Sequence, residues 1–451
     1  MTFPSLNNCT VAVIGLGYVG LPLALAFAEK KSCFKTKIPL NRKIIGFDIN
    51  KNRINQLSEG LDSTNEVKED KLKNLSLIKF TSQVENIALA DVFIITVPTP
   101  IKDGNIPDLL PLKDASTTVG KALKIRKIIN KQNKIKIPNP IIIYESTVYP
   151  GCTEEICLPI LEKESDLESN KGFFYGYSPE RINPGDPNHK LKDIQKITSG
   201  GNQESGNWIN DFYSSIIEAG THLTKNIKIA ETAKVIENTQ RDLNIAFVNE
   251  LSMIFKALNI STLEVLEAAK TKWNFLDFSP GLVGGHCIGI DPYYLKFKSK
   301  QMGFSPRLVS SGRQINNGMA KWIVDQLIIE MARRKLVIGG TKVLILGYSY
   351  KENCGDHRNS RVLDVISALK VYGLEYEIVD PYVDSEACKR DYAIEILNKI
   401  PDYSYSAVIA AVGHDIFRSI TPENWKKLII NNGIIFDIKG ICPKNLPVLK
   451  I

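Results

Sequence analysis

A cysteine in a glycine-rich segment is the residue whose type and setting point most directly to chemistry. Cys287 lies within Pro280–Pro292, together with Gly281, Gly284, Gly285 and Gly289. Glycines let the backbone come close to a neighbour, so a substrate carbon could reach this thiol, unlike a thiol packed in a core. Asp291 could accept a proton or activate water. Taken alone, such a segment is more often structural than catalytic.

A lysine and an asparagine form a second candidate pair. Lys234 and Asn238 are four residues apart in a stretch with helical apolar spacing, which predicts a long helix over Ile227–Ala268. Both side chains would point to one side of it. An ammonium and an amide there could stabilise a developing oxyanion. A surface lysine beside a polar residue is the alternative, and the spacing alone favours it.

The N-terminal part carries a glycine motif typical of dinucleotide binding. A predicted strand, Val11–Ile14, leads into Gly15-Leu-Gly17-Tyr18-Val19-Gly20, which opens a predicted helix. Here Gly15 allows the tight turn, Gly17 the approach of a pyrophosphate, and Gly20 close packing of helix on strand. The helix N-terminus would then face the phosphates.

An acid and two further loops would complete this crevice. Asp48 ends the second predicted strand, where its carboxylate could accept hydrogen bonds from both ribose hydroxyls and would repel a 2′-phosphate. NAD is therefore favoured over NADP. The loops Val97–Pro100, with Pro98 and Thr99, and Glu145–Val148, with Thr147, follow apolar strands at the edge where such sheets bind ligands.

Strand and helix patterns alternate at both ends of the chain and predict an α/β protein. We expect two Rossmann-like, doubly wound parallel-sheet domains joined by a central long-helix domain. The expected boundaries are 1–218 for the NAD-binding domain, 219–320 for the helical domain, which could supply dimer contacts, and 321–451 for the C-terminal α/β domain. The predicted strands are Val11–Ile14, Ile44–Phe47, Phe93–Val97, Ile141–Tyr144, Val343–Leu346, Tyr376–Val379, Ala407–Ala411 and Ile434–Phe436.

Composition excludes several classes of protein. With 43% hydrophobic and 24% charged residues, the 451-residue chain is neither disordered nor a small disulfide scaffold. Its net charge is only +8, and the basic run Lys121–Lys136 has no interleaved aromatic residues, so we expect no nucleic-acid partner. The uncharged stretch Val11–Ala28 is interrupted by glycines and a proline, so we expect no membrane segment.

Cysteine and histidine usage indicates the compartment. The eight cysteines include no CxxC pair. Only Cys152 and Cys157 are close in sequence, and the five histidines do not cluster beside that pair. We therefore expect thiols in the cytoplasm and no metal site.

Several motifs together carry a family resemblance. They are Gly15–Pro22, Val97–Pro100, Glu145–Gly151, Ser178–Arg181, Lys234–Asn238, Gly284–Asp291 and Gly347–Asn359. In this order they resemble the UDP-glucose/GDP-mannose dehydrogenase family of NAD-dependent nucleotide-sugar 6-dehydrogenases. The resemblance implies oxidation of a sugar C6 alcohol to a carboxylate with reduction of two NAD.

The resemblance also implies catalytic roles. Cys287 would attack the C6 aldehyde as a thiolate, the thiohemiacetal would be oxidised to a thioester, and water would hydrolyse it. Lys234 and Asn238 would stabilise the oxyanion, and Asp291 and Thr147 would handle protons through water. Glu180 would help to activate water in the thioester step. Some relatives carry a further Glu where this chain has Pro184, which leaves the identity of the base open.

Binding residues are implied in the same way. NAD would contact Gly15, Gly17, Tyr18, Val19, Gly20, Asp48, Arg53, Pro98, Thr99, Thr147 and Arg358. The substrate would contact Glu180, Arg181, Lys234, Asn238, Gly284, Gly285 and Lys351. Lys351 and Arg358 follow a strand without a GxGxxG motif, so no second dinucleotide is expected there. Surface charges on an ordinary loop are the alternative.

The sequence of Gly284–Leu295 resembles the family branch that acts on UDP-N-acetylhexosamines more than it resembles the UDP-glucose branch. The first branch includes the dehydrogenase of Vi-antigen synthesis. We therefore expect oxidation of UDP-GlcNAc or UDP-GalNAc for capsule or O-antigen biosynthesis, by a homodimer or higher homo-oligomer. The alternatives are UDP-glucose or UDP-ManNAc as substrate, and a catalytically silent NAD- and nucleotide-binding regulator. Retention of Cys287, Lys234, Asn238 and Asp291 argues against the regulator.

Overall fold

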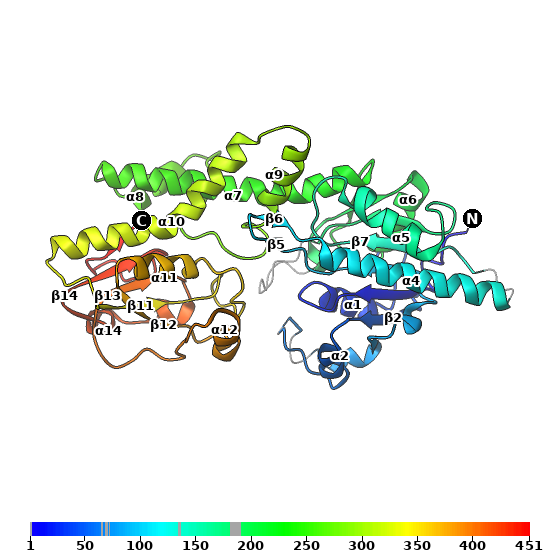
Figure 1. Cartoon of the computed structure of the whole chain (residues 1–451), viewed down its shortest axis with the longest axis horizontal. Helices are drawn as coiled ribbons and strands as arrows, with labels where there is room; N and C mark the ends of the chain where they lie inside the picture. Colours follow the sequence, from blue (N-terminus) through cyan, green and yellow to red (C-terminus); the bar gives the residue numbers. More distant parts are fainter. Residues whose placement is uncertain (1, 65, 68–70, 72, 134–136, 181–190) are drawn as a thin grey trace. The chain divides into compact units, whose positions relative to one another are not determined.

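The computed structural model describes residues 2–64, 66–67, 71, 73–133, 137–180 and 191–451 (Figure 1). The chain divides into two compact units. The first comprises Met1–Glu237 with Tyr293–Met302, and the second comprises Asn238–Pro292 with Gly303–Ile451.

The first unit is built on an eight-stranded sheet with the order β10-β9-β8-β7-β4-β1-β2-β3. The six neighbouring strands β8, β7, β4, β1, β2 and β3 run parallel to one another, as the alternation of strand and helix patterns predicts. β9 pairs with β8 in the antiparallel direction, which the apolar pattern does not reveal because it carries no strand direction. The strands are β1 Thr10–Ile14, β2 Lys43–Phe47, β3 Ile78–Thr81, β4 Val92–Ile95, β7 Ile141–Tyr144, β8 Phe174–Tyr177, β9 Lys196–Gly200 and β10 Thr221–Leu223.

Helices accompany this sheet, whose central strands are fully buried. They are α1 Gly20–Glu29, α2 Lys51–Ser58, α4 Leu110–Asn133, α5 Leu158–Ser165 and α6 Gln203–Ser214, with the short turns η1 Lys73–Leu77, η2 Val84–Ile87, η3 Thr153–Cys157 and η4 Leu191–Asp193. A small hairpin joins β5 Ile101–Lys102 to β6 Ile106–Pro107.

Part of the basic run Lys121–Lys136 is explained by contacts within this unit. Arg126 is buried and donates hydrogen bonds to Ala90 O at 2.9 Å and Pro138 O at 3.0 Å. Lys124 pairs with Asp166 at 2.9 Å. These side chains therefore hold the end of α4 in place.

The second unit contains a parallel five-stranded sheet with the order β12-β11-β13-β14-β15. Its strands are β11 Lys342–Leu346, β12 Glu375–Val379, β13 Tyr405–Ala410, β14 Ile429–Asp437 and β15 Leu449–Lys450. Its helices are α10 Arg307–Arg333, α11 Val362–Val371, α12 Ser385–Tyr392, α13 Asp415–Arg418 and α14 Pro422–Lys427. Met319, Ile323 and Leu327 of α10 lie in the same buried apolar cluster as Val343 and Ile345 of β11.

The predicted helix to Ala268 is wrong at its C-terminal end. α7 spans Ile227–Ala257 and α8 spans Thr262–Lys270. Between them Asn259 takes a left-handed backbone conformation with φ of 56°, and the Ser261 hydroxyl accepts a hydrogen bond from Glu264 N. A left-handed asparagine ends one helix and a serine cap begins the next.

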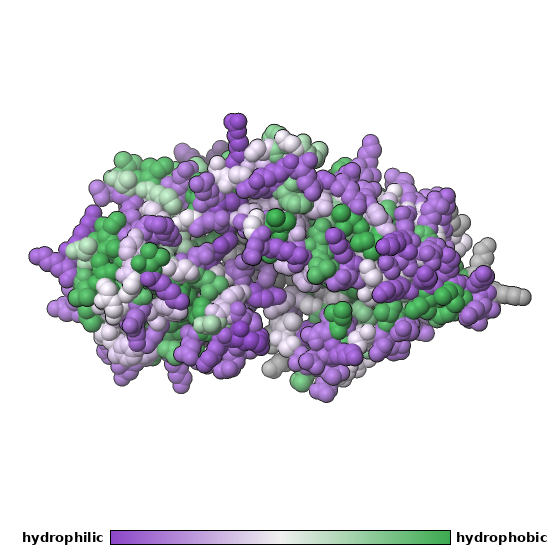
Figure 2. All heavy atoms as spheres, in the orientation of Figure 1, coloured by the Kyte–Doolittle hydropathy of each residue, from purple (hydrophilic) through white to green (hydrophobic). Residues whose placement is uncertain are grey.

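The remaining helix, α9 Asp291–Gln301, begins at a candidate catalytic residue. In the described residues, no helix combines the length and apolar character needed to cross a membrane. The face shown in Figure 2 carries many hydrophilic side chains, interspersed with separate hydrophobic patches.

Candidate functional site

The loop between β1 and α1 has the shape that its three glycines allow. Gly15 has a φ of 94°, and its N–H donates to Phe47 O at 2.8 Å. A Cβ atom at Gly20 would lie 1.8 Å from Gly15 O, whereas one at Gly17 would meet nothing within 4 Å. The first and last glycines are therefore needed for the turn, and open space remains above Gly17. This cradle at a helix N-terminus fits a pyrophosphate.

Two side chains brace this loop from the second strand and α2. Asp48 Oδ2 accepts a hydrogen bond from Leu16 N at 2.8 Å. Arg53 is buried, and its guanidinium donates to Leu16 O at 3.0 Å and to Asp62 at 2.8 Å. Arg53 thus supports the loop through its backbone, and its direct contact with NAD stays a prediction. The neighbouring Tyr18 and Val19 are half-buried.

Two further predicted loops meet at the ends of adjacent strands. Ser146 Oγ donates to Val97 O at 2.6 Å, which joins the loop after β7 to the loop after β4. Tyr294 donates to Thr99 O at 2.9 Å. Thr147 is half-buried. Because β7, β4 and β1 are neighbours, their three loops share one sheet edge.

Glu231 on α7 ties the loop after β7 to the helix that carries Lys234. Its buried carboxylate accepts hydrogen bonds from Gly151 N and Thr153 N at the start of η3. Burial raises the pKa of Glu231 to about 7 against these hydrogen bonds. No motif of the sequence singles out this residue.

The structure unites Asn238 and Asp291. Both are buried, and Asn238 Nδ2 donates to Asp291 Oδ2 at 2.7 Å. Asp291 N donates to Cys287 O at 2.9 Å, while the Cys287 side chain is exposed. Lys234, one turn before Asn238 on α7, is also buried, so the surface-lysine interpretation is wrong. An accessible thiol therefore lies four residues before a buried, amide-bound carboxylate.

The cysteine loop, Pro280–Ile290, is packed against the loop Gly347–Asn359. A Cβ at Gly284 would lie 2.7 Å from Asn359 O, and one at Gly285 would lie 2.7 Å from the Tyr350 ring. Asn359 also exchanges two hydrogen bonds with the backbone of Gly285. Because Gly284 and Gly285 have no side chain, the neighbouring loop can pack closely against them. Their predicted contact with substrate stays untested.

A polar network that the motifs missed holds the start of the cysteine loop. Asn249 of α7 accepts from Gly281 N at 2.8 Å and donates to Gly281 O at 3.1 Å. It also donates to Asn316 of α10, which in turn donates to Asp242, the buried partner of Arg313. Positions 238, 242 and 249 fall on one face of a helix. This stripe of polar residues in an otherwise apolar helix is the sequence pattern that could have indicated the network.

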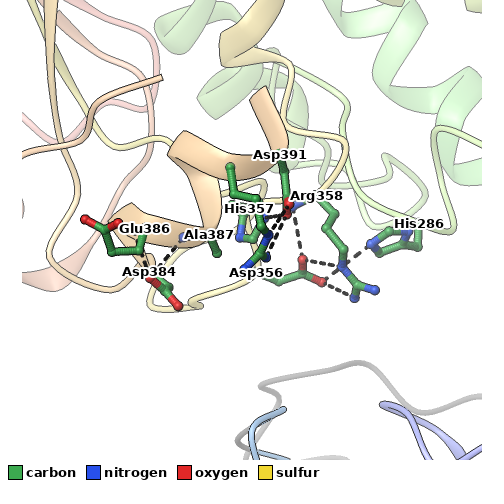
Figure 3. A network of polar contacts seen from close by, with 9 residues as sticks. His286, Asp356, His357, Arg358, Asp384, Glu386, Ala387 and Asp391 are labelled. Atoms are coloured by element: carbon green, nitrogen blue, oxygen red, sulfur yellow. Dashed lines mark hydrogen bonds and ion pairs between the residues drawn. The ribbon is translucent and has the colours of Figure 1, made fainter. Parts of the chain in front are cut away.

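Polar contacts also fix the far side of the cysteine loop (Figure 3). Arg358 donates two hydrogen bonds to Asp356, at 2.9 and 2.8 Å, and His286 Nε2 lies 3.6 Å from the same carboxylate. Burial would raise the pKa of Asp356, but the hydrogen bonds and charges of Arg358 and His286 hold it well below its usual range. The residue next to Cys287 is therefore linked to a predicted cofactor ligand.

The base of Gly347–Asn359 is anchored by a buried aspartate. Asp380 accepts hydrogen bonds from Tyr348 N at 2.7 Å and Ser349 N at 2.9 Å, and lies 3.0 Å from His414 Nε2. Because Asn353 N donates to His414 Nδ1, the histidine proton belongs on Nε2, from where it is donated to Asp380.

A cavity of about 210 Å³ opens beside this loop in the second unit. Its charged lining side chains are Lys351, Arg361, Lys439 and Glu352, so positive charge predominates. Burial lowers the pKa of Lys439. Phosphate oxygens suit such a lining. Lys439 lies in none of the motifs of the sequence, so the sequence alone did not indicate that it is a candidate binding residue.

Three parts of the chain match models of one family. Residues 9–217 match the NAD binding domain of the UDP-glucose/GDP-mannose dehydrogenase family, 228–318 its central domain and 344–444 its UDP binding domain. The chain belongs to the UDP-glucose/GDP-mannose dehydrogenase family. The resemblance, the α/β fold class and the cofactor NAD are thereby confirmed, and the protein is an NAD-dependent nucleotide-sugar dehydrogenase.

Relatives in this dehydrogenase family match nearly end to end. The chain is 46% identical to a UDP-N-acetyl-D-glucosamine 6-dehydrogenase of Salmonella typhi, over 97% of each chain. It is 45% identical to one of Pseudomonas aeruginosa, over 99% of this chain and 100% of the relative. The solved structure of a UDP-D-ManNAc dehydrogenase from Pyrococcus horikoshii matches with a TM-score of 0.82 and 27% identity, covering 98% of this chain and 99% of that one.

Arg181, a predicted substrate ligand, lies outside the described residues. Within the described part of the chain, no three His, Cys, Asp or Glu side chains are grouped so that they could hold a metal ion.

Glu231 should make stability depend on pH. The pKa of Glu231 is about 7 in the folded protein, against an ordinary value of 4.5, so the folded state binds its proton more tightly than the unfolded state does. The contribution of this proton to the free energy of unfolding is therefore complete below about pH 4.5 and is lost as the pH rises through 7. The substitution Glu231→Gln removes this titration. We expect the stability advantage of the wild type over this variant to shrink by ~3 kcal/mol between pH 4.5 and 8, measured from thermal unfolding. Glu267→Gln, on the exposed side of α8, is the control, and a gap independent of pH would refute the assignment.

Asn249 should control the cysteine loop. Asn249→Ala leaves both backbone groups of Gly281 without their partner, at a cost of ~3 kcal/mol. We expect a lower unfolding temperature, faster amide hydrogen exchange over Pro280–Ile290 and reduced turnover. Asn244→Ala on the same helix is the matched control. Unchanged exchange in this loop would show that Asn249 does not hold it.

Proposed function

We propose that this dehydrogenase oxidises the C6 hydroxyl of UDP-GlcNAc, or of its epimer UDP-GalNAc, to the uronic acid through a thioester on Cys287. One observation carries the proposal: the exposed Cys287 thiol follows two glycines and leads directly into the buried Asn238–Asp291 pair. Covalent aldehyde oxidation needs a nucleophile and a hydride acceptor, and a carboxylate held by an amide can move the protons.

The steps follow from these groups. Removal of a proton and a hydride converts the C6 alcohol to an aldehyde. The Cys287 thiolate adds to the aldehyde carbon, and the oxyanion of the thiohemiacetal is stabilised by Lys234 and Asn238. Loss of a second hydride gives a thioester, and water then releases the carboxylate and restores the thiol. Asp291, Thr147 and Glu180 would move the protons through water.

The first unit suits NAD, which accepts the hydrides when bound. The open space above Gly17 and the helix N-terminus at Gly20 favour binding of the pyrophosphate. The Asp48 carboxylate would accept hydrogen bonds from the ribose hydroxyls. Pro98 and Thr99 lie at the same sheet edge. In the second unit, Lys351 and Lys439 would bind the diphosphate of the substrate.

The choice of sugar rests on the comparisons with relatives. Two relatives named as UDP-N-acetyl-D-glucosamine 6-dehydrogenases share 45–46% of residues with this chain. The structural neighbour named as a UDP-D-ManNAc dehydrogenase shares 27%, so UDP-ManNAc is the second candidate. Because the product would keep its nucleoside diphosphate as a leaving group, it suits a glycosyl transfer that builds surface polysaccharide.

We also propose a homodimer that forms through the central helical domain, residues 219–320, between NAD-binding and C-terminal domains of 1–218 and 321–451. Phe247, Ile254 and Leu258 follow one face of α7 and its end, and each has about half of its surface exposed. Such an apolar stripe favours burial against a second copy. A cytoplasmic location is favoured because all eight cysteines, each in the described part of the chain, are thiols.

Counting NADH tests the reaction. We expect two NADH per sugar with UDP-GlcNAc or UDP-GalNAc, and little turnover with UDP-ManNAc or UDP-glucose. Cys287→Ser should lower kcat by more than about 10³-fold because no thioester can form, whereas Cys33→Ala, a thiol in the segment between α1 and β2, should not. One NADH per sugar, or acid formation by Cys287→Ser at the wild-type rate, would refute the mechanism.

The interface prediction is tested by mass in solution. Phe247→Glu places a charge within the apolar stripe, so we expect sedimentation to show a monomer where the wild type is a dimer. Val371→Glu, at the exposed end of α11, is the matched control and should leave the dimer intact. A Phe247→Glu protein that remains dimeric would place the interface elsewhere.

A further inference from the structure

A group of charged side chains lies buried in the first unit, outside the cysteine loop. Lys196, Glu145 and Glu180 have side-chain exposures of 3%, 0% and 9%. Lys196 Nζ is 2.9 Å from Glu145 Oε2 and 3.5 Å from Glu180 Oε2. Burying three ionisable groups costs several kcal/mol unless they compensate one another. Of the three, the proposed reaction uses only Glu180.

The strand that runs against its neighbours creates this group. Glu145 directly follows β7 and Glu180 follows β8, so both lie at the carboxyl edge of the sheet. Lys196 is the first residue of β9. Because β9 is antiparallel to β8, with Tyr177 opposite Ser199, the same register places Lys196 opposite Glu180. A parallel strand would have put its first residue at the other edge of the sheet.

The ammonium of Lys196 has its full set of acceptors here. It donates to Glu145 at 2.9 Å, to Pro179 O at 3.2 Å and to Glu180 at 3.5 Å. An ammonium carries three N–H groups. The Tyr213 hydroxyl donates to the other oxygen of Glu145, and the Tyr213 ring lies 4.9 Å from Lys196 Nζ. These contacts hold the Lys196 ammonium from several sides, next to Glu180.

The charges do not cancel when both carboxyl groups are ionised, because two carboxylates then face one ammonium. Burial raises the pKa of Glu145 to about 7, opposed by Lys196 and reinforced by Glu180. Burial would lower the pKa of Lys196, but both carboxylates raise it above its usual value. Burial also raises the pKa of Tyr213, which stays neutral. Glu145 therefore gains or loses a proton near neutral pH.

We propose that Lys196 is a positioning residue that holds the Glu180 carboxylate for the thioester step, and that Glu145 and Tyr213 fix the ammonium from its other side. The inference rests on the proposed function, in which Glu180 helps to activate water. It assigns Lys196 no contact with substrate. When Glu145 is protonated, Lys196 pairs with Glu180 alone, and when Glu145 is ionised the ammonium is shared. The state of Glu145 would therefore modulate how tightly Glu180 is held.

The test separates positioning from mere stability. In Lys196→Met, Glu180 loses its ion pair, so we expect kcat to fall on the order of 10²-fold with the KM for sugar changed less than about threefold. Slow hydrolysis should let the sugar thioester on Cys287 accumulate, as an added mass in quenched enzyme. Lys196→Arg keeps the charge and should recover most of the rate. Lys192→Met, an exposed lysine near the start of β9, is the matched control.

A second variant keeps the test decisive if Lys196→Met does not fold. Glu145→Gln preserves size and removes the group that titrates near pH 7, so we expect a flatter dependence of kcat on pH between 6 and 8. Lys196→Met without added thioester, or Glu145→Gln with the wild-type pH dependence, would overturn the inference. Absence of two NADH per sugar in the wild-type enzyme would instead overturn the proposed function, and with it this role for Lys196.

Discussion

The paired hydrogen bonds between Asn249 and the backbone of Gly281 are the contact on which the cysteine loop depends. Between Pro280 and Ile290 the chain forms neither helix nor strand, so its backbone groups need partners from elsewhere. One amide side chain satisfies both a donor and an acceptor of the loop, and Asn316 and Asp242 orient that amide. The exposed thiol can keep a defined position because the segment leading to it is held by buried groups.

A single helix organises the polar contacts of both units. On α7, Glu231 holds the start of η3 in the first unit, while Asn238 and Asn249 hold Asp291 and Gly281 in the second. A long helix is well suited to this task because its own backbone bonds are internally satisfied, which leaves its buried polar side chains free to bind loops. The chemistry proposed for Lys234 lies between these anchoring positions.

Local patterns predicted what local physics determines. The spacing of Gly15, Gly17 and Gly20 and the apolar strands identified the NAD-binding sheet. The break between α7 and α8 was missed, although Ser261 and Glu264 have the spacing of a helix N-cap. The direction of β9 was not readable, because alternation of apolar residues is the same in both directions. Nor could spacing show that Asn238 meets Asp291, 53 residues later, since that contact depends on tertiary packing. The family motifs contain the residues for which catalysis is proposed and leave out Glu231, Asn249 and Lys196, which contact the surroundings of those residues.

Two of the buried ionic groups in the described residues differ in what they can do. Asp242 and Arg313 join α7 to α10 as one carboxylate against one guanidinium, with Asn316 completing the set. A balanced pair of this kind carries no net charge and fixes how two helices pack. Lys196 faces two carboxyl groups, and because the pKa of Glu145 is about 7, its cluster gains a negative charge as the pH rises through neutrality. Packing alone gives no reason to retain that charge. The proposed role of Lys196, which is to hold the Glu180 carboxylate for the thioester step, does give such a reason.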